Sequence, residues 1–422
     1  MRESIVVADR PAPASPRYSE PLRDIPQTIT VIPASVIQQQ GAVSLDRCAP
    51  QRARPYHRRR RGSTPAGDNL TIRGNSARND IFVDGVRDLS PQSRDPFNVE
   101  QVEVTKGPTS AVSGRGSAGG TVNLTSKGPS LEPHSGVGLW PWEMRTRAAP
   151  PLDINSSLRR LGLGEHTAVR LNLLKHDAGV AGRDVVKNDR WGIAPTLAFG
   201  LGTTTRFTLG YYKLKQDNIS DYGIPWIPAT NNALAQYRDQ PAPVPRNTFY
   251  GFRDRDREVL NQDTGTAKFE RDFGDVNAVT HSIALRQAGR NSMATPPRLA
   301  GNDTTTINRE LRSWVAKDRI WDNQTDLRTQ FQTFGIRHTL VTGAAFTHEQ
   351  NTAHQPHRSE FAHHAAQPQP RRHLHRRHRH QPVRGRSHRQ HPVPYGRSIP
   401  PSWATTGRPP ADCAGSDSRS MA

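Results

Sequence analysis

A period of two in the hydrophobic pattern is the feature that most constrains what this chain can fold into. In residues 168–173, apolar side chains alternate strictly with small or polar ones, and residues 206–211 and 279–286 repeat the pattern. Successive side chains of a β-strand point to opposite faces, so this period indicates long strands with one apolar face. No apolar run reaches the ~20 residues that a membrane-spanning helix needs. The chain is therefore expected to be mainly β-structure.

About eight segments between residues 152 and 350 carry this alternation. They lie near residues 152–160, 166–177, 190–201, 204–217, 262–273, 277–290, 317–331 and 335–349. Residues 218–261 separate the fourth segment from the fifth and are rich in proline and aromatic residues, which indicates a long exposed loop. A membrane barrel and a soluble β-sandwich both alternate in this way, so the period alone leaves these two folds open.

The net charge of +20 is concentrated in two segments. Residues 47–61 carry seven arginines and no acid, and residues 351–422 carry twelve arginines, three acids and ten of the seventeen histidines. A basic arm for nucleic acid, a metal-binding histidine tract and disordered, non-native sequence are the possible interpretations of the second segment. We favour disordered sequence from a shifted reading frame, and extend this interpretation to Arg52–Arg61 and Leu139–Pro151.

The first 131 residues combine short strands with a short helix, which indicates a compact α+β domain. Asp84 and Gly85, within Ile81–Val86, suit the two-residue type I′ turn of a hairpin. Residues Ala34–Gln40 have a helical pattern that ends near Gly41. Further strands are expected at Thr28–Ile32, Leu70–Gly74, Val99–Val104 and Thr121–Thr125.

Residues Gly114–Gly119 match the G-x-G-x-x-G pattern of dinucleotide-binding proteins. That fingerprint needs a strand before it and a helix that opens within it, because the helix N-terminus holds the pyrophosphate. Here a strand follows instead, so we do not expect NAD or FAD to bind. We expect the glycines at these positions to permit a positive φ and close backbone approach.

Five segments of this domain, in this order, resemble the plug of TonB-dependent outer-membrane receptors. They are Pro21–Gln27, Thr71–Gly74, Asn79–Gly85, Val102–Pro108 and Gly114–Asn123. The segments Arg87–Leu89, Arg94–Asn98 and Gly114–Ser117 are most similar to the catecholate-siderophore branch of the family. The chain departs from the family pattern at Arg52–Arg61, where a short stretch ending in Pro-Gly-Val is usual.

The resemblance implies a plug domain followed by an antiparallel transmembrane β-barrel. The expected parts are a TonB-box-like segment at residues 1–20, the plug at 21–131, a partial barrel of about eight strands at 152–350 and a disordered basic tail at 351–422. Plugged outer-membrane transporters have about 22 strands, so eight would leave the barrel incomplete. No secretory signal is visible after Met1. We therefore expect an outer-membrane receptor encoded by a truncated or frameshifted copy, and we expect this copy to be inactive.

The resemblance also implies which residues would form each site. The TonB box, which would pair with TonB by adding a strand, would be Glu3, Ser4, Ile5, Val6 and Val7. Cationic and aromatic residues expected to bind the ferric siderophore are Arg78, Arg87, Arg94, Tyr222 and Trp226. Residues expected to be structural in the plug are Arg73, Gly74, Asp84, Gly85, Glu103, Lys106, Gly107, Gly114, Arg115, Gly116, Gly119 and Gly120.

The implied function is TonB-dependent uptake of a ferric siderophore, with iron carried only as the chelate. No catalytic residues, resident cofactor, metal site or specific nucleic-acid partner are expected. The expected partners are the ferric siderophore, TonB with its inner-membrane energising complex, and outer-membrane lipid. Two alternatives remain open: a receptor for cobalamin, haem or a carbohydrate, and a basic nucleic-acid-binding protein acting through residues 351–422.

Overall fold

The computed structural model describes residues 12–48, 67–137, 151–354 and 360–364, with short internal gaps. These gaps are residues 19, 69, 91, 111–113, 115–116, 163, 181, 275–276 and 302–303. The predictions for the TonB box at Glu3–Val7, for Arg115 and Gly116, for the Arg52–Arg61 and Leu139–Pro150 segments and for residues 365–422 therefore lie outside the described residues.

The N-terminal domain is a small mixed sheet with two short helices. Its five-stranded sheet has the order β1-β6-β7-β4-β5, in which β4 and β7 are parallel and the other neighbours antiparallel. The elements are β1 (Thr28–Pro33), α1 (Ala34–Gln39), α2 (Leu45–Cys48), β2 (Thr71–Ile72), β3 (Asn75–Ser76), β4 (Ile81–Val83), β5 (Val86–Arg87), η1 (Pro96–Asn98), β6 (Val99–Lys106) and β7 (Gly120–Ser126). No helix in the described ranges has the length and hydrophobicity to cross a membrane.

The core of this domain lies between the sheet and the two helices. Val102, Val104 and Val122 are fully buried on the central strands, and Cys48 packs in the same cluster at 2% exposure. The predicted hairpin turn is confirmed, because Asp84 and Gly85 have φ values of 52° and 79°, as a type I′ turn requires.

Close packing explains the glycine-rich bend before β7. A Cβ on Gly120, whose φ is 140°, would lie 2.1 Å from the carbonyl oxygen of Thr105 on β6. A Cβ on Gly119 would lie 2.5 Å from the carbonyl oxygen of Ile72. The strand β7 begins directly at Gly120. The G-x-G-x-x-G match thus leads into a strand, as expected, and its last glycine is required by packing.

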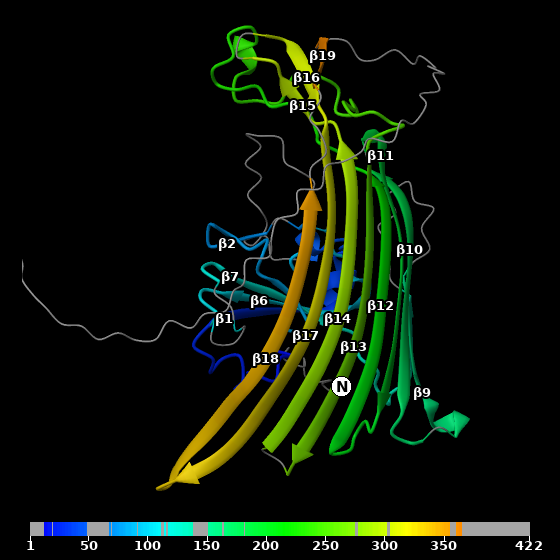
Figure 1. Ribbon diagram of the computed structural model, residues 1–422, viewed down its shortest axis with the longest axis vertical. Helices are drawn as coiled ribbons and strands as arrows, with labels where there is room; N and C mark the ends of the chain where they lie inside the picture. Colours follow the sequence, from blue (N-terminus) through cyan, green and yellow to red (C-terminus); the bar gives the residue numbers. More distant parts are fainter. Residues whose placement is uncertain are drawn as a thin grey trace, which may run out of the picture. The chain divides into compact units, whose positions relative to one another are not determined.

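A nine-stranded antiparallel sheet follows the small domain, and Figure 1 shows its long strands side by side. Its order is β18-β17-β14-β13-β12-β11-β10-β9-β8, and it is not closed among the described residues. Its strands are β8 (His134–Val137), β9 (Leu152–Ser157), β10 (Ala168–Val180), β11 (Arg183–Phe199), β12 (Thr205–Ile219), β13 (Arg257–Phe273), β14 (Asn277–Ala294), β17 (Arg312–Thr333) and β18 (Ile336–His354). The eight predicted strands are therefore confirmed.

The connections divide the sheet into two different ends. Residues 220–256, with η3 (Ala235–Tyr237), and residues 295–311, with β15 (Pro297–Leu299) and β16 (Thr306–Glu310), form the long connections at one end. Residues 200–204 and 334–335 form short turns at the other. We call these the long-loop end and the short-turn end. Unequal ends of this kind are typical of outer-membrane barrels.

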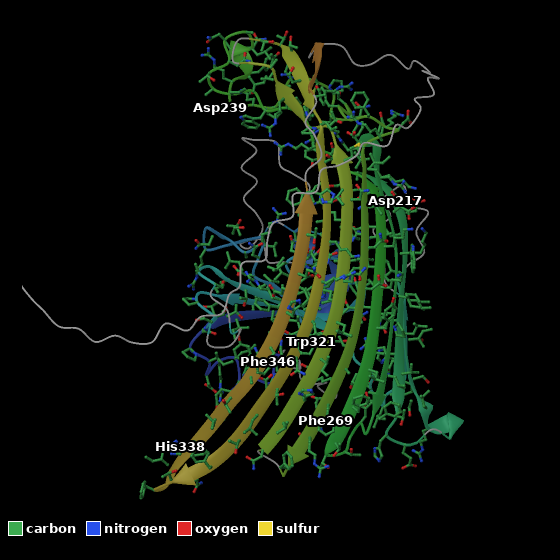
Figure 2. The ribbon with its side chains drawn as sticks, in the orientation of Figure 1. Asp217, Asp239, Phe269, Trp321, His338 and Phe346 are labelled. Carbon is green, nitrogen blue, oxygen red and sulfur yellow. The ribbon has the colours of Figure 1, made fainter. Side chains whose placement is uncertain are left out.

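The two faces of the sheet differ as the alternation predicted. On β14, Leu285 is 57% exposed on the outer face, whereas Ala284 and Arg286 are 7% and 6% exposed on the inner face. Large apolar side chains follow the outer face of the other strands, and Figure 2 labels Phe269, Trp321 and Phe346 among them. This polar-inside, apolar-outside arrangement is that of a membrane barrel wall.

The structure corrects two strand predictions. Residues His134–Val137 form the additional edge strand β8, which has too few apolar residues to show a period. The tail was expected to begin at residue 351, but β18 runs to His354 and Glu360–His364 form β19, which pairs with β16. Disorder was wrongly predicted there because backbone pairing with a neighbouring strand does not depend on an apolar composition.

Candidate functional site

An exposed arginine marks the loop that follows β3 in the small domain. Arg78 is exposed, and its guanidinium has no ion-pair partner among the described residues. Partial desolvation, and then the nearby charge of Arg290, lower the pKa of Arg78. Arg290 lies near the end of β14 that leads into the long connection 295–311. Arg78 therefore faces the long-loop end as a cation available to an anionic ligand.

The nine-stranded sheet, here called the wall, supplies a charged pair near Arg78, and the long connection 220–256 supplies a tyrosine. The guanidinium of Arg290 lies 2.6 Å from the Glu258 carboxylate of β13, and both side chains are buried. Tyr222, in the long connection 220–256, lies close enough to Arg290 and Glu258 for both charges to act on its hydroxyl, and its burial raises its pKa. A cation, a buried ion pair and a phenol thus converge on one region.

The other three predicted ligand residues have different surroundings. Arg87 donates from Nε to the carbonyl oxygen of Asn79 over 2.5 Å and lies 3.8 Å from Asp80, so it braces the loop that carries Arg78. Trp226 is partly buried and forms a bridge with Pro241 inside the long connection. Both side chains are only partly exposed, whereas Arg78 is exposed.

Arg94 is not part of an exposed site, and the prediction that it contacts the ligand is corrected here. It is 6% exposed and donates to the carboxylates of Asp68 and Asp88 at 3.0 Å each, and to the carbonyl oxygens of Asp88 and Ser90. Arg286 of the wall also lies 3.5 Å from Asp88. A buried arginine with this many partners holds the loop together and cannot reach a ligand without breaking them.

Acidification is expected to release this cluster. Burial alone would raise the pKa of Asp88, but Arg94 and Arg286 together lower it below its usual range. A carboxylate whose pKa is lower in the folded state stabilises the fold above its unfolded pKa, and this stability is lost as the pH falls through the folded value. Labelling of the buried Cys48 thiol, performed with a thiol reagent active in acid, should therefore rise steeply at acidic pH. A flat profile down to pH 3 would contradict the expectation.

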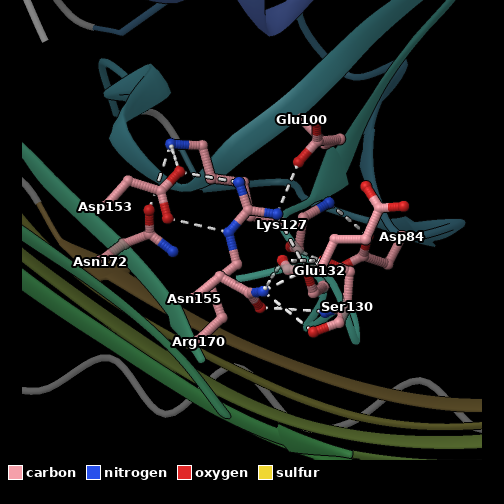
Figure 3. Close-up of polar contacts among 11 residues, drawn as sticks. Asp84, Glu100, Lys127, Ser130, Glu132, Asp153, Asn155, Arg170 and Asn172 are labelled. Atoms are coloured by element: carbon pink, nitrogen blue, oxygen red, sulfur yellow. Dashed lines mark hydrogen bonds and ion pairs between the residues drawn. The ribbon is translucent and has the colours of Figure 1, made fainter. Parts of the chain in front are cut away.

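A second polar network joins the end of β7 to the wall (Figure 3). The Lys127 ammonium lies 3.0 Å from Asp153 of β9 and donates to Asn172 of β10 over 3.1 Å. Arg170 of β10 pairs with Glu100 at 2.9 Å and with Asp153 at 2.7 Å. Burial lowers the pKa of Lys127, opposed by Asp153. Since Lys127 and Glu100 belong to the small domain, these ion pairs fix it to the wall.

Sequence reasoning missed the residues of the wall that complete the site. They are Glu258, Arg286, Arg290, Asp153 and Arg170. The available signal was their inward position in alternating strands, because a charge on that face must meet a partner. In the described ranges no group of three His, Cys, Asp or Glu side chains is arranged to hold a metal ion.

These features are those of a plug domain and the wall strands of an outer-membrane barrel, and comparison with known proteins agrees. Residues 21–121 match the family model described as the TonB-dependent receptor plug domain. The chain belongs to the TonB-dependent receptors over its plug and its barrel strands. The predicted family, fold class and outer-membrane location are confirmed.

Named relatives extend the similarity beyond the plug. The chain is 38% identical over 339 residues to the probable TonB-dependent receptor BfrD of Bordetella pertussis. The aligned region covers 79% of this chain and 44% of BfrD. It is 33% identical over 361 residues to the catecholate siderophore receptor Fiu of Escherichia coli K12, covering 80% of this chain and 46% of Fiu. The chain spans about half the length of the curated relatives it matches.

Solved structures of siderophore receptors are similar to this chain over the same extent. The open form of the ferric-catecholate import receptor Fiu from E. coli K12 superposes with a TM-score of 0.67 at 32% identity, covering 80% of this chain and 52% of that one. The siderophore receptor PiuA from Acinetobacter baumannii superposes with a TM-score of 0.70 at 29% identity, covering 81% of this chain and 48% of that one.

Proposed function

We propose that this chain carries the plug and barrel strands of a receptor that takes up ferric siderophores across the outer membrane in a TonB-dependent step. The observation that carries the proposal is the exposed cation of Arg78, which has no ion-pair partner among the described residues and lies near Arg290, itself close to Tyr222, at the long-loop end. Similarity to Fiu favours a catecholate chelate as the cargo. The activity is transport, with binding and release of the intact chelate and no catalysis.

The chemistry of such a cargo suits the residues present. A ferric catecholate is anionic and has aromatic faces, so a guanidinium can donate charge-assisted hydrogen bonds to it and a phenol can pack against it. Arg78 would supply the charge, Tyr222 the aromatic contact, and Arg87 the support of the loop. We further propose that TonB pairs with Glu3–Val7 and draws the plug segment toward the periplasm.

Replacing Arg78 by alanine tests the proposed site. Affinity for a ferric tris-catecholate, measured by quenching of tryptophan fluorescence in detergent micelles, should fall about 10- to 100-fold, the range for a lost hydrogen bond to a charged group. The affinity of Arg78→Lys should lie between those of Arg78→Ala and the unmodified chain, because lysine keeps the positive charge but lacks the planar guanidinium group.

Arg23→Ala is the matched control, since Arg23 is an exposed arginine whose ion pair is with its neighbour Asp24. It should bind as the unmodified chain does. Equal affinity of Arg78→Ala and the unmodified chain would remove Arg78 from the site. Binding of cobalamin or haem, but of no ferric chelate, would overturn the proposed cargo.

A further inference from the structure

An apolar groove runs along strand β13 on the outer face of the wall, the face that points away from the plug. Its volume is about 500 Å³, within the range of about 300–1,000 Å³ typical of small-molecule sites. The groove exists because the outward positions at its floor carry the small residues Gly265 and Ala267. The larger side chains that border it, on strands β12 and β14, are Leu209, Tyr211, Ile283 and Leu285.

The apolar surface ends at the row of residues next to the groove on its long-loop side. Lys213, Asp263, Gln287 and Arg319 lie in this one cross-strand row. The Asp263 carboxylate accepts hydrogen bonds from the Lys213 ammonium over 2.7 Å and from the Tyr211 hydroxyl over 2.6 Å. The acid of this row is therefore neutralised by its neighbours, and the polar end of the groove carries no excess of negative charge.

Cations without an acidic partner flank this polar end. Lys215 of β12 and Lys317 and Arg319 of β17 are exposed, and none of them forms an ion pair within the part of the chain that the structure describes. Other cations of the outer face are paired, as Lys175 is with Asp189 at 2.8 Å. A net positive charge therefore remains at the polar end of the groove.

The three cations are close enough to act on one bound group. Strands β12 and β17 are three strand spacings apart, about 14–15 Å, and their long side chains extend from two neighbouring rows. The second row contains Lys215, Asn261, Gly289 and Lys317. An anion above Asn261 and Gln287 would thus have a cation on each side and two amide groups as hydrogen-bond donors.

The combination of an apolar groove with a cationic end indicates an amphipathic occupant. Methylene groups gain free energy when they leave water for an apolar surface, so the groove suits a hydrocarbon chain. Phosphate oxygens form strong, charge-assisted hydrogen bonds with lysine and arginine, so the polar end suits a phosphorylated group. A small soluble anion would leave the groove unused, and an uncharged hydrocarbon would leave the cations unused.

We propose that this groove binds one acyl chain of a membrane lipid whose phosphorylated headgroup is held by Lys215, Lys317 and Arg319. The lipid belongs to the outer leaflet, because the cationic end of the groove points toward the long connections, which are extracellular in outer-membrane barrels. The site uses only residues of the outer face, so it does not depend on the identity of the transported cargo.

Native mass spectrometry of the full-length chain, released from detergent micelles with added lipid, tests the site. The probe is diphosphoryl lipid A, and zwitterionic phosphatidylcholine is the comparison lipid. One lipid A molecule should bind per chain, more tightly than phosphatidylcholine. Gly265→Leu should weaken this binding about tenfold, because the new side chain displaces about two methylene groups from the groove. A Cβ on Gly265 would have no atom within 4 Å, so the sheet should tolerate the change.

Ala344→Leu is the matched control for the groove. Ala344 is a small outward residue of β18 that lies opposite Thr325 and does not line the groove. It should bind lipid A as the unmodified chain does. Circular dichroism of both variants reports their strand content, so a loss of binding caused by unfolding would be recognised.

The headgroup contacts are tested by a second set of variants on exposed positions. Replacing Lys215 and Arg319 together by glutamine should weaken lipid A binding at least tenfold, since hydrogen bonds to a charged group are lost, and should leave phosphatidylcholine binding unchanged. Lys175→Gln is the control, because Lys175 is a cation of the same face that is paired with Asp189. It should change the binding of neither lipid.

Three results would overturn the proposal. The first is equal lipid A affinity in Gly265→Leu and Ala344→Leu, which would show that no acyl chain occupies the groove. The second is equal affinity in the double glutamine variant and Lys175→Gln, which would remove the headgroup contacts. The third is a dimer of the chain that Gly265→Leu abolishes while lipid binding persists, because the groove would then be an interface between two copies.

Discussion

Arg94→Ala is expected to unfold the plug at neutral pH. The change leaves the carboxylates of Asp68 and Asp88, both 1% exposed, without the guanidinium that pairs with each at 3.0 Å. Removing one partner of a buried ion pair costs about 3–5 kcal/mol. A domain of this size has a small margin of stability, so this loss is comparable with the whole free energy of unfolding. Arg286 still faces Asp88, so the removal of Arg94 should destabilise Asp68 more than Asp88.

The measurement is urea-induced unfolding followed by labelling of Cys48, which packs in the plug core. Arg87→Ala is the matched control, because Arg87 is a plug arginine whose ion pair with Asp80 is longer and less buried. It should lower stability by less than about 1 kcal/mol, as partly exposed pairs do. A shared unfolding midpoint for the two variants would show that Arg94 is no more important to the plug than a surface arginine.

Gly120→Ala is expected to disrupt the plug sheet almost as severely. The new Cβ would lie 2.1 Å from the Thr105 carbonyl oxygen, and the backbone φ of 140° is one that L-residues rarely adopt. Strain of the backbone alone costs about 1–3 kcal/mol, and the contact with β6 backbone cannot be relieved by rotating a side chain. Cys48 should become reactive at a lower urea concentration than in the unmodified chain.

Gly136→Ala gives the comparison for this change. Gly136 lies in β8, has no positive φ and has open space where a Cβ would be. It should leave the unfolding midpoint unchanged. If Gly120→Ala matched it, the close approach of β7 to β6 would not be the reason for a glycine at position 120.

Local chemistry made much of the fold predictable. The long strands were visible because a period of two depends only on which face each residue presents, as Leu285 and Arg286 illustrate. The hairpin at Asp84 and Gly85 was predictable because only a few residue types tolerate positive φ at two successive positions. Strand β8 was missed because four residues with a single large apolar side chain carry too little pattern.

The site was less predictable, because burial and pairing are decided by parts of the chain far apart in sequence. Arg78 and Arg94 were both predicted to bind the ligand, and nothing in the local sequence separates them. The acids around Arg94 make it structural: Asp68 lies 26 residues away, and Arg286 of the wall shares Asp88 with it. Arg290 and Glu258 were likewise visible only as polar residues on an inward face.

The ion pairs between the plug and the wall have a consequence for how the protein is made. Asp95 of the plug is buried, burial raises its pKa, and its counter-charge is Arg190 of β11, 2.7 Å away. Asp88 and Glu100 likewise share arginines of β14 and β10. A plug synthesised before these strands keeps Arg94 beside Asp88 but lacks the wall arginines that face Asp95, Asp88 and Glu100. These ion pairs can form only when strands β10, β11 and β14 are in place, so the final packing of the plug depends on the wall.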